Sequence, residues 1–224
     1  MNMENTSIVF PQRKIKKSYR SVTGHFPSVK NNRSVAFESL LEKSLFLSLE
    51  FDNTVQSYIE QPQLQIEEAG KSKTYSADCY VKHTDASNKK DLIVEVKYVS
   101  ELRREQQKLE RKFRAIETAV NQMGMEFTLF TDETFPPLYL DNLDFLYRYK
   151  TQSTDNNHNL QIIEHIKEPI SAFDLADSLA RTKTEYFILA NEIWALVSCG
   201  RLHADLHQEA LTMNSIVWRN YERH

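Results

Sequence analysis

Apolar and polar positions alternate along residues 34–150 with periods that predict helices and strands in a definite order. A helical period spans Ser34 to Glu50, where Phe37, Leu40, Leu41, Leu45, Phe46, Leu47 and Leu49 give a broad apolar face. Shorter runs predict strands at Thr54–Ile59, Leu64–Ile66, Ser76–Val81 and Leu92–Val96, with a polar turn from Glu67 to Lys73. A long charged helix is then expected from Ser100 to Met123, followed by a buried strand at Phe127–Phe130 and a helix at Leu138–Tyr149.

The pattern changes at TQSTDNNHN, residues 151–159, which is polar and contains no aliphatic side chain, so we expect a linker there. Beyond it, three short helices are predicted at Leu160–Lys167, Ser171–Arg181 and Thr184–Ser198, and Arg201–His207 alternates like a short strand or wing. This pattern predicts an α/β protein with four parts: a basic arm (1–35), a larger α/β domain (36–150), a linker (151–159) and a small winged-helix-like domain (160–224).

The segment from Tyr75 to Lys97 carries the most informative polar residues. Asp78 lies in the first of its two predicted strands, and Glu95 interrupts the aliphatic run of the second. Residues two apart in a strand share a face, so Glu95 and Lys97 should point the same way. A hairpin would bring Asp78 beside them. Two carboxylates and a lysine around one point can hold Mg²⁺ and orient a water against a phosphate, although an acid-x-lysine pair on a strand also occurs as a surface ion pair.

Composition excludes some classes of protein. The chain has 224 residues, of which 41% are hydrophobic and 26% charged, as in ordinary globular domains. No apolar run approaches the roughly 20 residues that a membrane span needs, so we expect no membrane contact. Cys79 and Cys199 lie far apart without a CxxC spacing, which favours free thiols in the reducing cytoplasm. The formal net charge of −3 gives no sign of nucleic-acid binding, so local patches must carry that function.

One such patch is the N-terminal stretch, which we expect to be irregular. It is strongly basic through Arg13, Lys14, Lys16, Lys17, Arg20, Lys30 and Arg33. Composition alone favours a solvated arm, and the alternative is an arm that neutralises DNA phosphates.

Four motifs occur in order along the chain: RSVTGHFPSVKNNRSVAFESLLEKSLFLSLEFD, YIEQP, YSADCYV and EVK. In these motifs the chain resembles the TnsA family from Arg13 to about Tyr149. TnsA proteins are endonuclease subunits of heteromeric cut-and-paste transposases. The resemblance implies a restriction-endonuclease-like PD-(D/E)xK domain that cuts the 5′, non-transferred strands at transposon ends in double-stranded DNA. It also implies a partner transposase, TnsB, and an AAA+ regulator, TnsC, that binds the C-terminal part.

The same resemblance assigns roles to individual residues. The family's helical glutamate falls on Glu42, with Glu38 as the competing candidate, and its aspartate falls on Asp78. The acid-x-lysine pair falls on Glu95 and Lys97, and the Val96 carbonyl would join the carboxylates in holding one or two Mg²⁺ ions, with Mn²⁺ as a substitute. Ala77 stands where related proteins have proline, and Gln61 stands where the family also has glutamine, either to orient a site residue or to form a turn.

These assignments predict in-line attack of water on a phosphodiester, with Lys97 orienting or deprotonating the water. Two other functions compete with this one. A catalytically silent adaptor that binds DNA or protein would have no reason to keep Asp78, Glu95 and Lys97 together. A generic restriction or repair nuclease would not be expected to carry the GHFPS…ESLLE stretch and the C-terminal domain.

Overall fold

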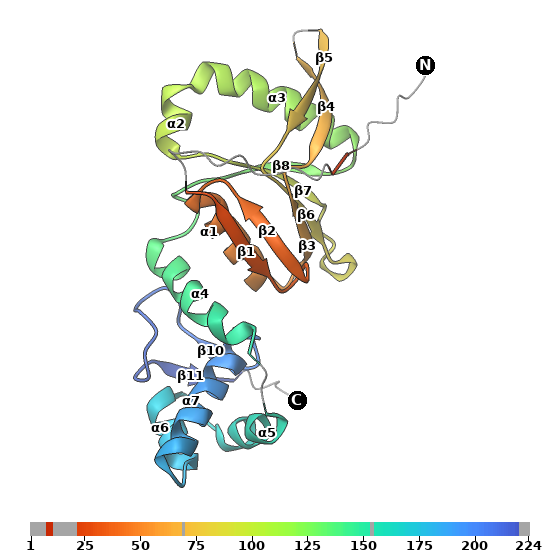
Figure 1. Cartoon of the computed structure of the whole chain (residues 1–224). Helices are drawn as coiled ribbons and strands as arrows, with labels where there is room; N and C mark the ends of the chain where they lie inside the picture. The colour runs from red at the N-terminus through yellow and green to blue at the C-terminus, as the bar shows by residue number, and fades with distance from the viewer. Residues whose placement is uncertain (1–7, 11–21, 69, 153–154, 220–224) are drawn as a thin grey trace. The chain divides into compact units, whose positions relative to one another are not determined.

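The structure, a computed structural model, describes residues 8–10, 22–68, 70–152 and 155–219 (Figure 1). The chain forms two compact units, Met1–Thr134 and Phe135–His224. The expected α/β class is confirmed, since the first unit contains a four-stranded mixed sheet flanked by helices, consistent with a restriction-endonuclease-like core. Along the described residues, none of the helices is both long enough and apolar enough to cross a membrane.

The central sheet has the strand order β3-β6-β7-β8, formed by Val55–Glu60, Cys79–His83, Leu92–Val96 and Glu126–Phe130. The first three strands pair antiparallel, and β8 runs parallel to β7. The parallel step needs a crossover, which α2 (Val99–Arg104) and α3 (Gln106–Gln122) provide. One long helix was expected over this region, but the structure divides it at Glu105.

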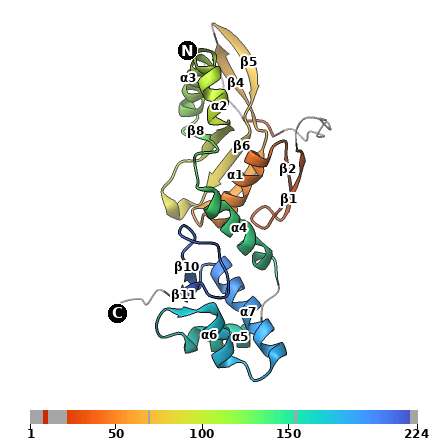
Figure 2. The same ribbon diagram turned by 90° about the vertical axis from the view of Figure 1, so that its left-hand side faces the viewer.

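Two hairpins extend from this sheet. One pairs β1 (Gly24–Ser28) with β2 (Arg33–Phe37), and the other pairs β4 (Gln63–Glu68) with β5 (Lys71–Ser76) (Figure 2). The second hairpin packs with α3 around a core of buried side chains, namely Leu64, Ile66, Tyr75, Ala77, Ile93, Ile116, Ala119, Val120 and Met125. This packing brings β5 and α3 together beside β7.

Helix α1 spans Leu40–Phe51, so the prediction that a helix starts at Ser34 is wrong. The true start is set by Ser39, whose hydroxyl accepts a hydrogen bond from the Glu42 amide at 3.0 Å, while the Glu42 carboxylate reaches back to the Glu38 amide at 2.9 Å. This pair resembles a capping box, except that the Glu42 carboxylate accepts from the residue before the N-cap. Glu38 therefore precedes the helix and does not lie one turn before Glu42 on its surface.

The hairpin β1–β2 also corrects the expectation of an irregular arm through residue 35. Gly24 fits a close approach here, because a β-carbon at this position would lie 2.5 Å from the Phe37 ring. The buried side chains of Phe26, Val35 and Phe37 hold the hairpin against the core. Of the expected arm, only residues 8–10 and 22–35 are described, and the cations Arg13, Lys14, Lys16, Lys17 and Arg20 lie outside the described residues.

The second unit contains α4 (Pro137–Lys150), α5 (Asn156–His165), α6 (Ala172–Leu179) and α7 (Lys183–Ser198). Short strands β9 (Ile170–Ser171), β10 (His203–Ala204) and β11 (Ile216–Trp218) form an antiparallel sheet in the order β10-β11-β9. Helices α5 to α7 and this sheet are the elements that a winged-helix domain needs, and the winged-helix assignment itself stays a prediction.

Helix α4 is grouped with the second unit, which differs from the boundary expected after residue 150. The side-chain amide of Asn142 explains this, because it donates to the Leu206 and Glu209 carbonyls at 3.0 and 2.9 Å and accepts from the Leu211 amide at 2.9 Å. Part of the expected linker, from Asn156 onward, is the start of α5.

Candidate active site

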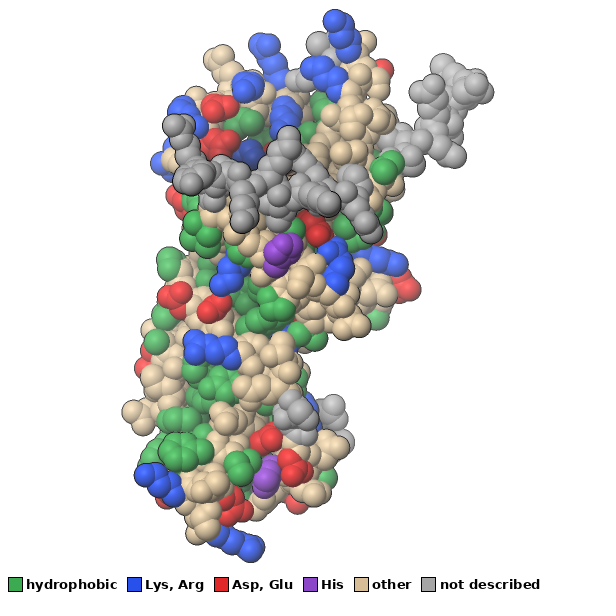
Figure 3. All heavy atoms as spheres, in the orientation of Figure 1, with side chains coloured by type: hydrophobic (Ala, Val, Ile, Leu, Met, Phe, Trp, Pro, Cys, Tyr) green, Lys and Arg blue, Asp and Glu red, His purple; other side chains and the backbone are tan. Residues whose placement is uncertain are grey.

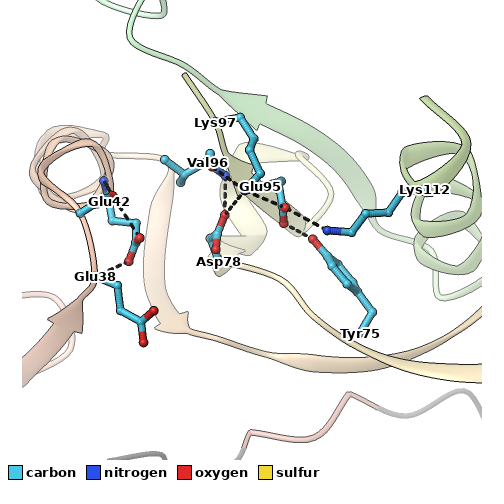
Figure 4. Close-up of polar contacts among 9 residues, drawn as sticks. Glu38, Glu42, Tyr75, Asp78, Glu95, Val96, Lys97 and Lys112 are labelled. Carbon is cyan, nitrogen blue, oxygen red and sulfur yellow. Dashed lines mark hydrogen bonds and ion pairs between the residues drawn. The ribbon is translucent and has the colours of Figure 1, made fainter. Parts of the chain in front are cut away.

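The candidate site forms where β7 ends and β6 begins. Asp78 directly precedes β6, and its Oδ2 accepts a hydrogen bond from the Val96 amide at 2.6 Å. Glu95 lies in β7 with only 3% of its side chain exposed. Lys97 follows the strand, and its Nζ lies 3.1 Å from Glu95 Oε1 and 3.9 Å from Asp78 Oδ2. The predicted convergence of Asp78, Glu95 and Lys97 is therefore present in the fold (Figure 4).

The oxygens at this point suit a hard divalent cation. The Lys97 ammonium also donates to the Val96 carbonyl at 3.0 Å, so one positive charge lies among the three oxygens predicted to bind metal. Within the described part of the chain, no three His, Cys, Asp or Glu side chains form a preassembled metal cluster. Two carboxylates and a carbonyl are nevertheless the donor types that Mg²⁺ prefers, so the residues fit the cation.

The two candidate helical glutamates lie to one side of Asp78 in Figure 4. Both carboxylate oxygens of Glu42 accept hydrogen bonds at the start of α1. Oε1 accepts from the Ser39 hydroxyl at 3.0 Å, and Oε2 accepts from the Glu38 amide. Glu38 Oε1 accepts from the Gln61 side-chain amide at 3.0 Å. Neither carboxylate has a described hydrogen bond to Asp78, and both remain candidates for the family's glutamate.

Burial perturbs the acids of this site. The pKa of Asp78 is raised, chiefly because burial disfavours the carboxylate, and the Val96 amide and Lys97 offset only part of this effect. The pKa of Glu42 is raised for the same main reason, with the charge of Asp78 adding to it against the hydrogen bond from Glu38. For Lys97, burial acts to lower the pKa, but Glu95 and Asp78 outweigh it and the net shift is upward. In this state Lys97 is therefore an ammonium that donates hydrogen bonds.

Two site residues were missed by the sequence pattern. The Tyr75 hydroxyl, from the end of β5, donates to Glu95 Oε2. Lys112, from the middle of α3, lies 3.3 Å from Glu95 Oε1, and its Nζ is 4.5 Å from the centroid of the Tyr75 ring. Tyr75 stands in the YSADCYV motif, but only the packing of β5 and α3 shows that both residues meet Glu95.

Gln61 combines the two roles considered for it. Its φ of 51° is in the left-handed region, which is uncommon for a residue other than glycine, and it forms the turn between β3 and β4. Its backbone amide donates to the Asp78 carbonyl at 3.0 Å, while its side chain donates to Glu38. The turn thus ties Glu38 to the backbone of Asp78.

Two cations expected to contact DNA make contacts within the chain, and their contact with DNA stays a prediction. Lys30 Nζ donates to the Val55 carbonyl at 2.6 Å and to the Asp52 carbonyl, and Arg33 pairs with Glu60 through both terminal nitrogens.

Other cations cover the surface around α2, α3 and β5, where Figure 3 shows many blue side chains. The exposed ones include Lys71, Lys73, Arg103, Arg104, Lys108 and Arg111.

Comparison with known families bears directly on this site. Residues 52–132 match the model of the TnsA-like endonuclease N-terminal domain of Tn7 type. This part of the chain is therefore similar to the TnsA-like endonuclease domain. The TnsA-like segment includes Tyr75, Asp78, Glu95, Lys97 and Lys112, and it begins after Glu38 and Glu42. No curated protein sequence matched the chain. The match indicates a nuclease of the Tn7 type.

Proposed function

We propose that this protein is a metal-dependent DNA endonuclease that cuts the 5′, non-transferred strands at transposon ends during cut-and-paste transposition. The observation that carries the proposal is the convergence of Asp78, Glu95 and the Val96 carbonyl around the Lys97 ammonium inside a TnsA-like domain. A partner transposase of the TnsB type would process the 3′ ends. A TnsC-type regulator would bind the second unit.

Each residue has a distinct part in the proposed reaction. Asp78, Glu95 and the Val96 carbonyl would hold the cation, and Glu42 or Glu38 would complete the set. When bound, a divalent cation polarises the scissile phosphate and lowers the pKa of the attacking water. Lys97, which is protonated in the described state, would orient that water through a hydrogen bond and offset charge on the phosphate. General-base action of Lys97 is the less suitable of its two expected roles.

The cationic surface near the site supports a DNA substrate. Lys108 and Arg104 have 82% and 71% of their side chains exposed, so solvent-facing charge is available on α2 and α3. Side chains of this kind neutralise phosphates without reading sequence. Recognition of the transposon end would therefore come mainly from the partner transposase.

Strand-specific mapping of nicks on a duplex carrying a transposon end tests the proposal. We expect Mg²⁺-dependent nicks on the 5′ strand at the transposon boundary when the partner transposase is present, and no nicks with Asp78→Ala. Full cutting in excess chelator would contradict a metal-dependent mechanism. The catalytically silent adaptor would be favoured if the wild type bound the transposon end specifically without nicking it and Asp78→Ala bound the end equally well.

A further inference from the structure

Glu95 has a partner on each of its carboxylate oxygens. The Tyr75 hydroxyl donates to Oε2, while Lys97 and Lys112 lie 3.1 and 3.3 Å from Oε1. The Glu95 side chain is 3% exposed, so solvent does not replace these partners. Only Lys97 among them was expected to belong to the site.

We propose that Tyr75 positions Glu95 for cation binding and that Lys112 balances the charge of Glu95 until the cation binds. This inference rests on the proposed function, because it assigns roles to two residues around the same carboxylate. Tyr75 and Lys112 are positioning residues here, since they act through Glu95.

The surroundings of Tyr75 make it a rigid support. Tyr75 is 8% exposed and belongs to the core cluster that joins β4, β5 and α3. The ring cannot move without disturbing that core, so its hydroxyl occupies a fixed point. A carboxylate held through Oε2 has its plane fixed, and Oε1 is then directed toward Lys97 and the Asp78 side of the site (Figure 4). Outer partners of metal ligands commonly orient the ligand in this way.

Lys112 has the opposite effect on a cation. Its ammonium contacts the same Oε1 that would become a ligand, so it repels a divalent ion at that oxygen. It also stacks on the Tyr75 ring, where a cation–π contact gives it a second favourable partner. The position over the ring stabilises Lys112 beside Glu95 while the carboxylate has no metal. Tyr75 should thus strengthen cation binding, and Lys112 should weaken it.

The test measures Mn²⁺ binding to the full chain by titration calorimetry, without DNA. Tyr75→Phe removes the hydroxyl and keeps the ring that the core needs, so the fold should persist. We expect its Mn²⁺ affinity to fall by about 10-fold to 100-fold, the usual effect of losing an outer partner of a ligand. Tyr80→Phe is the matched control, because the Tyr80 hydroxyl donates to Asp91 at 2.5 Å at the other end of β7. Its affinity should equal that of the wild type.

Lys112→Met keeps much of the aliphatic length and removes the charge, and we expect Mn²⁺ to bind about tenfold tighter. Lys112→Arg should return the affinity to near the wild-type value. Lys108→Met, one turn earlier on α3, is the control, because Lys108 pairs only with Glu105 among the described contacts. Denaturant unfolding without cation checks that every variant is folded.

The signs of the two effects decide the outcome. The inference is supported if Tyr75→Phe binds Mn²⁺ more weakly than the wild type and Lys112→Met binds it more tightly. Unchanged affinity in both, or a loss of affinity in both, overturns it, because general loosening of the site would weaken both variants alike. If the inference about Tyr75 and Lys112 fails in this way, the proposed function still stands provided that the wild type binds Mn²⁺ and Asp78→Ala does not. If the wild type does not bind Mn²⁺, the proposed function fails and the inference fails with it.

Discussion

At the scale of single residues, burial makes the ionised form of Asp78 less favourable in the folded protein. Its carboxylate accepts from the Val96 amide, yet burial raises its pKa above the ordinary aspartate value. A carboxyl whose pKa is higher in the folded state favours folding most below its unfolded pKa. That contribution is lost as the pH rises through the folded pKa. A cation bound beside the Asp78 carboxylate would offset this unfavourable burial of charge.

Asp78→Asn should raise the free energy of unfolding at pH 7 when no divalent cation is present. The amide oxygen can still accept from Val96, while the buried charge is gone. Urea unfolding at pH 7 measures the gain, and the gain should shrink below the ordinary aspartate pKa, where both forms are neutral. A less stable Asn variant at pH 7 would mean that the attraction to Lys97 dominates instead. The same variant should not nick DNA.

The acids of the site also predict how nicking depends on pH. Because the pKa values of Asp78 and Glu42 are both raised, mainly by burial, cation binding should require a higher pH than ordinary carboxylates would. At limiting Mg²⁺, the rate of nicking should therefore begin to fall, as the pH is lowered, at a pH above the usual range for aspartate. A higher Mg²⁺ concentration should move this acid limb of the pH profile to lower pH. An acid limb insensitive to Mg²⁺ would show that these carboxyls do not bind the ion.

Sequence reasoning found Asp78, Glu95 and Lys97 because strand periodicity places them on one face and chain reversal brings them together. It missed Tyr75 and Lys112, which reach Glu95 only through the packing of a hairpin and a helix. The spacing of Ser39 and Glu42 is typical of a helix start, and it places Glu38 outside the helix.

At the scale of elements, the hairpin β1–β2 shows where periodicity fails. Phe37 is buried in a strand and Leu41 in a helix, yet their spacing continues one helical stripe across the boundary at Ser39. Strand β7, by contrast, matches the predicted range of Leu92–Val96, because a short aliphatic run between polar segments fits a buried strand. The crossover from β7 to β8 was predicted as one helix, since nothing in its charge pattern marks the break at Glu105.

Lys30 gives a prediction at this scale, because it ties the hairpin to the turn after α1. Lys30→Met should lower the free energy of unfolding by about 1–3 kcal/mol, since the Asp52 and Val55 carbonyls lose a charged donor. Denaturant unfolding measures this, with the exposed Lys82→Met as the control. A normal unfolding curve with weakened DNA binding would instead return Lys30 to the phosphate-contacting role expected from its sequence.

At the scale of the whole molecule, the two units set where the chain can be divided. Helix α4 buries Leu143 and Leu146 within the second unit, and Asn142 pins the 206–211 loop. A protein ending at Thr134 should therefore be more soluble and unfold more cooperatively than one ending at Lys150, because the longer one would expose the apolar face of α4. Comparison of their solubility, cooperativity of unfolding and Mn²⁺ binding tests this. Equal behaviour would place the boundary after α4 after all.

The basic N-terminal residues would change the affinity of the whole molecule for any DNA duplex, whatever its sequence. Neutralising Lys14, Lys16, Lys17 and Arg20 should weaken binding to end-containing and random duplexes by a similar factor. It should also flatten the salt dependence by about 0.9 in slope per lost phosphate contact. Binding titrations over a range of salt concentrations measure both effects. A loss confined to the transposon end would show that these residues read bases.

The position of the Lys97 ammonium among three oxygens has a consequence for timing. At the proposed site, Asp78, Glu95 and the Val96 carbonyl would exchange the Lys97 ammonium for a divalent cation, so the lysine side chain would have to turn away for the cation to bind. An exchange of this kind has a conformational step whose rate does not depend on metal concentration. In a stopped-flow experiment, the observed rate of loading would rise with Mn²⁺ at first and then reach a plateau set by the motion of that side chain.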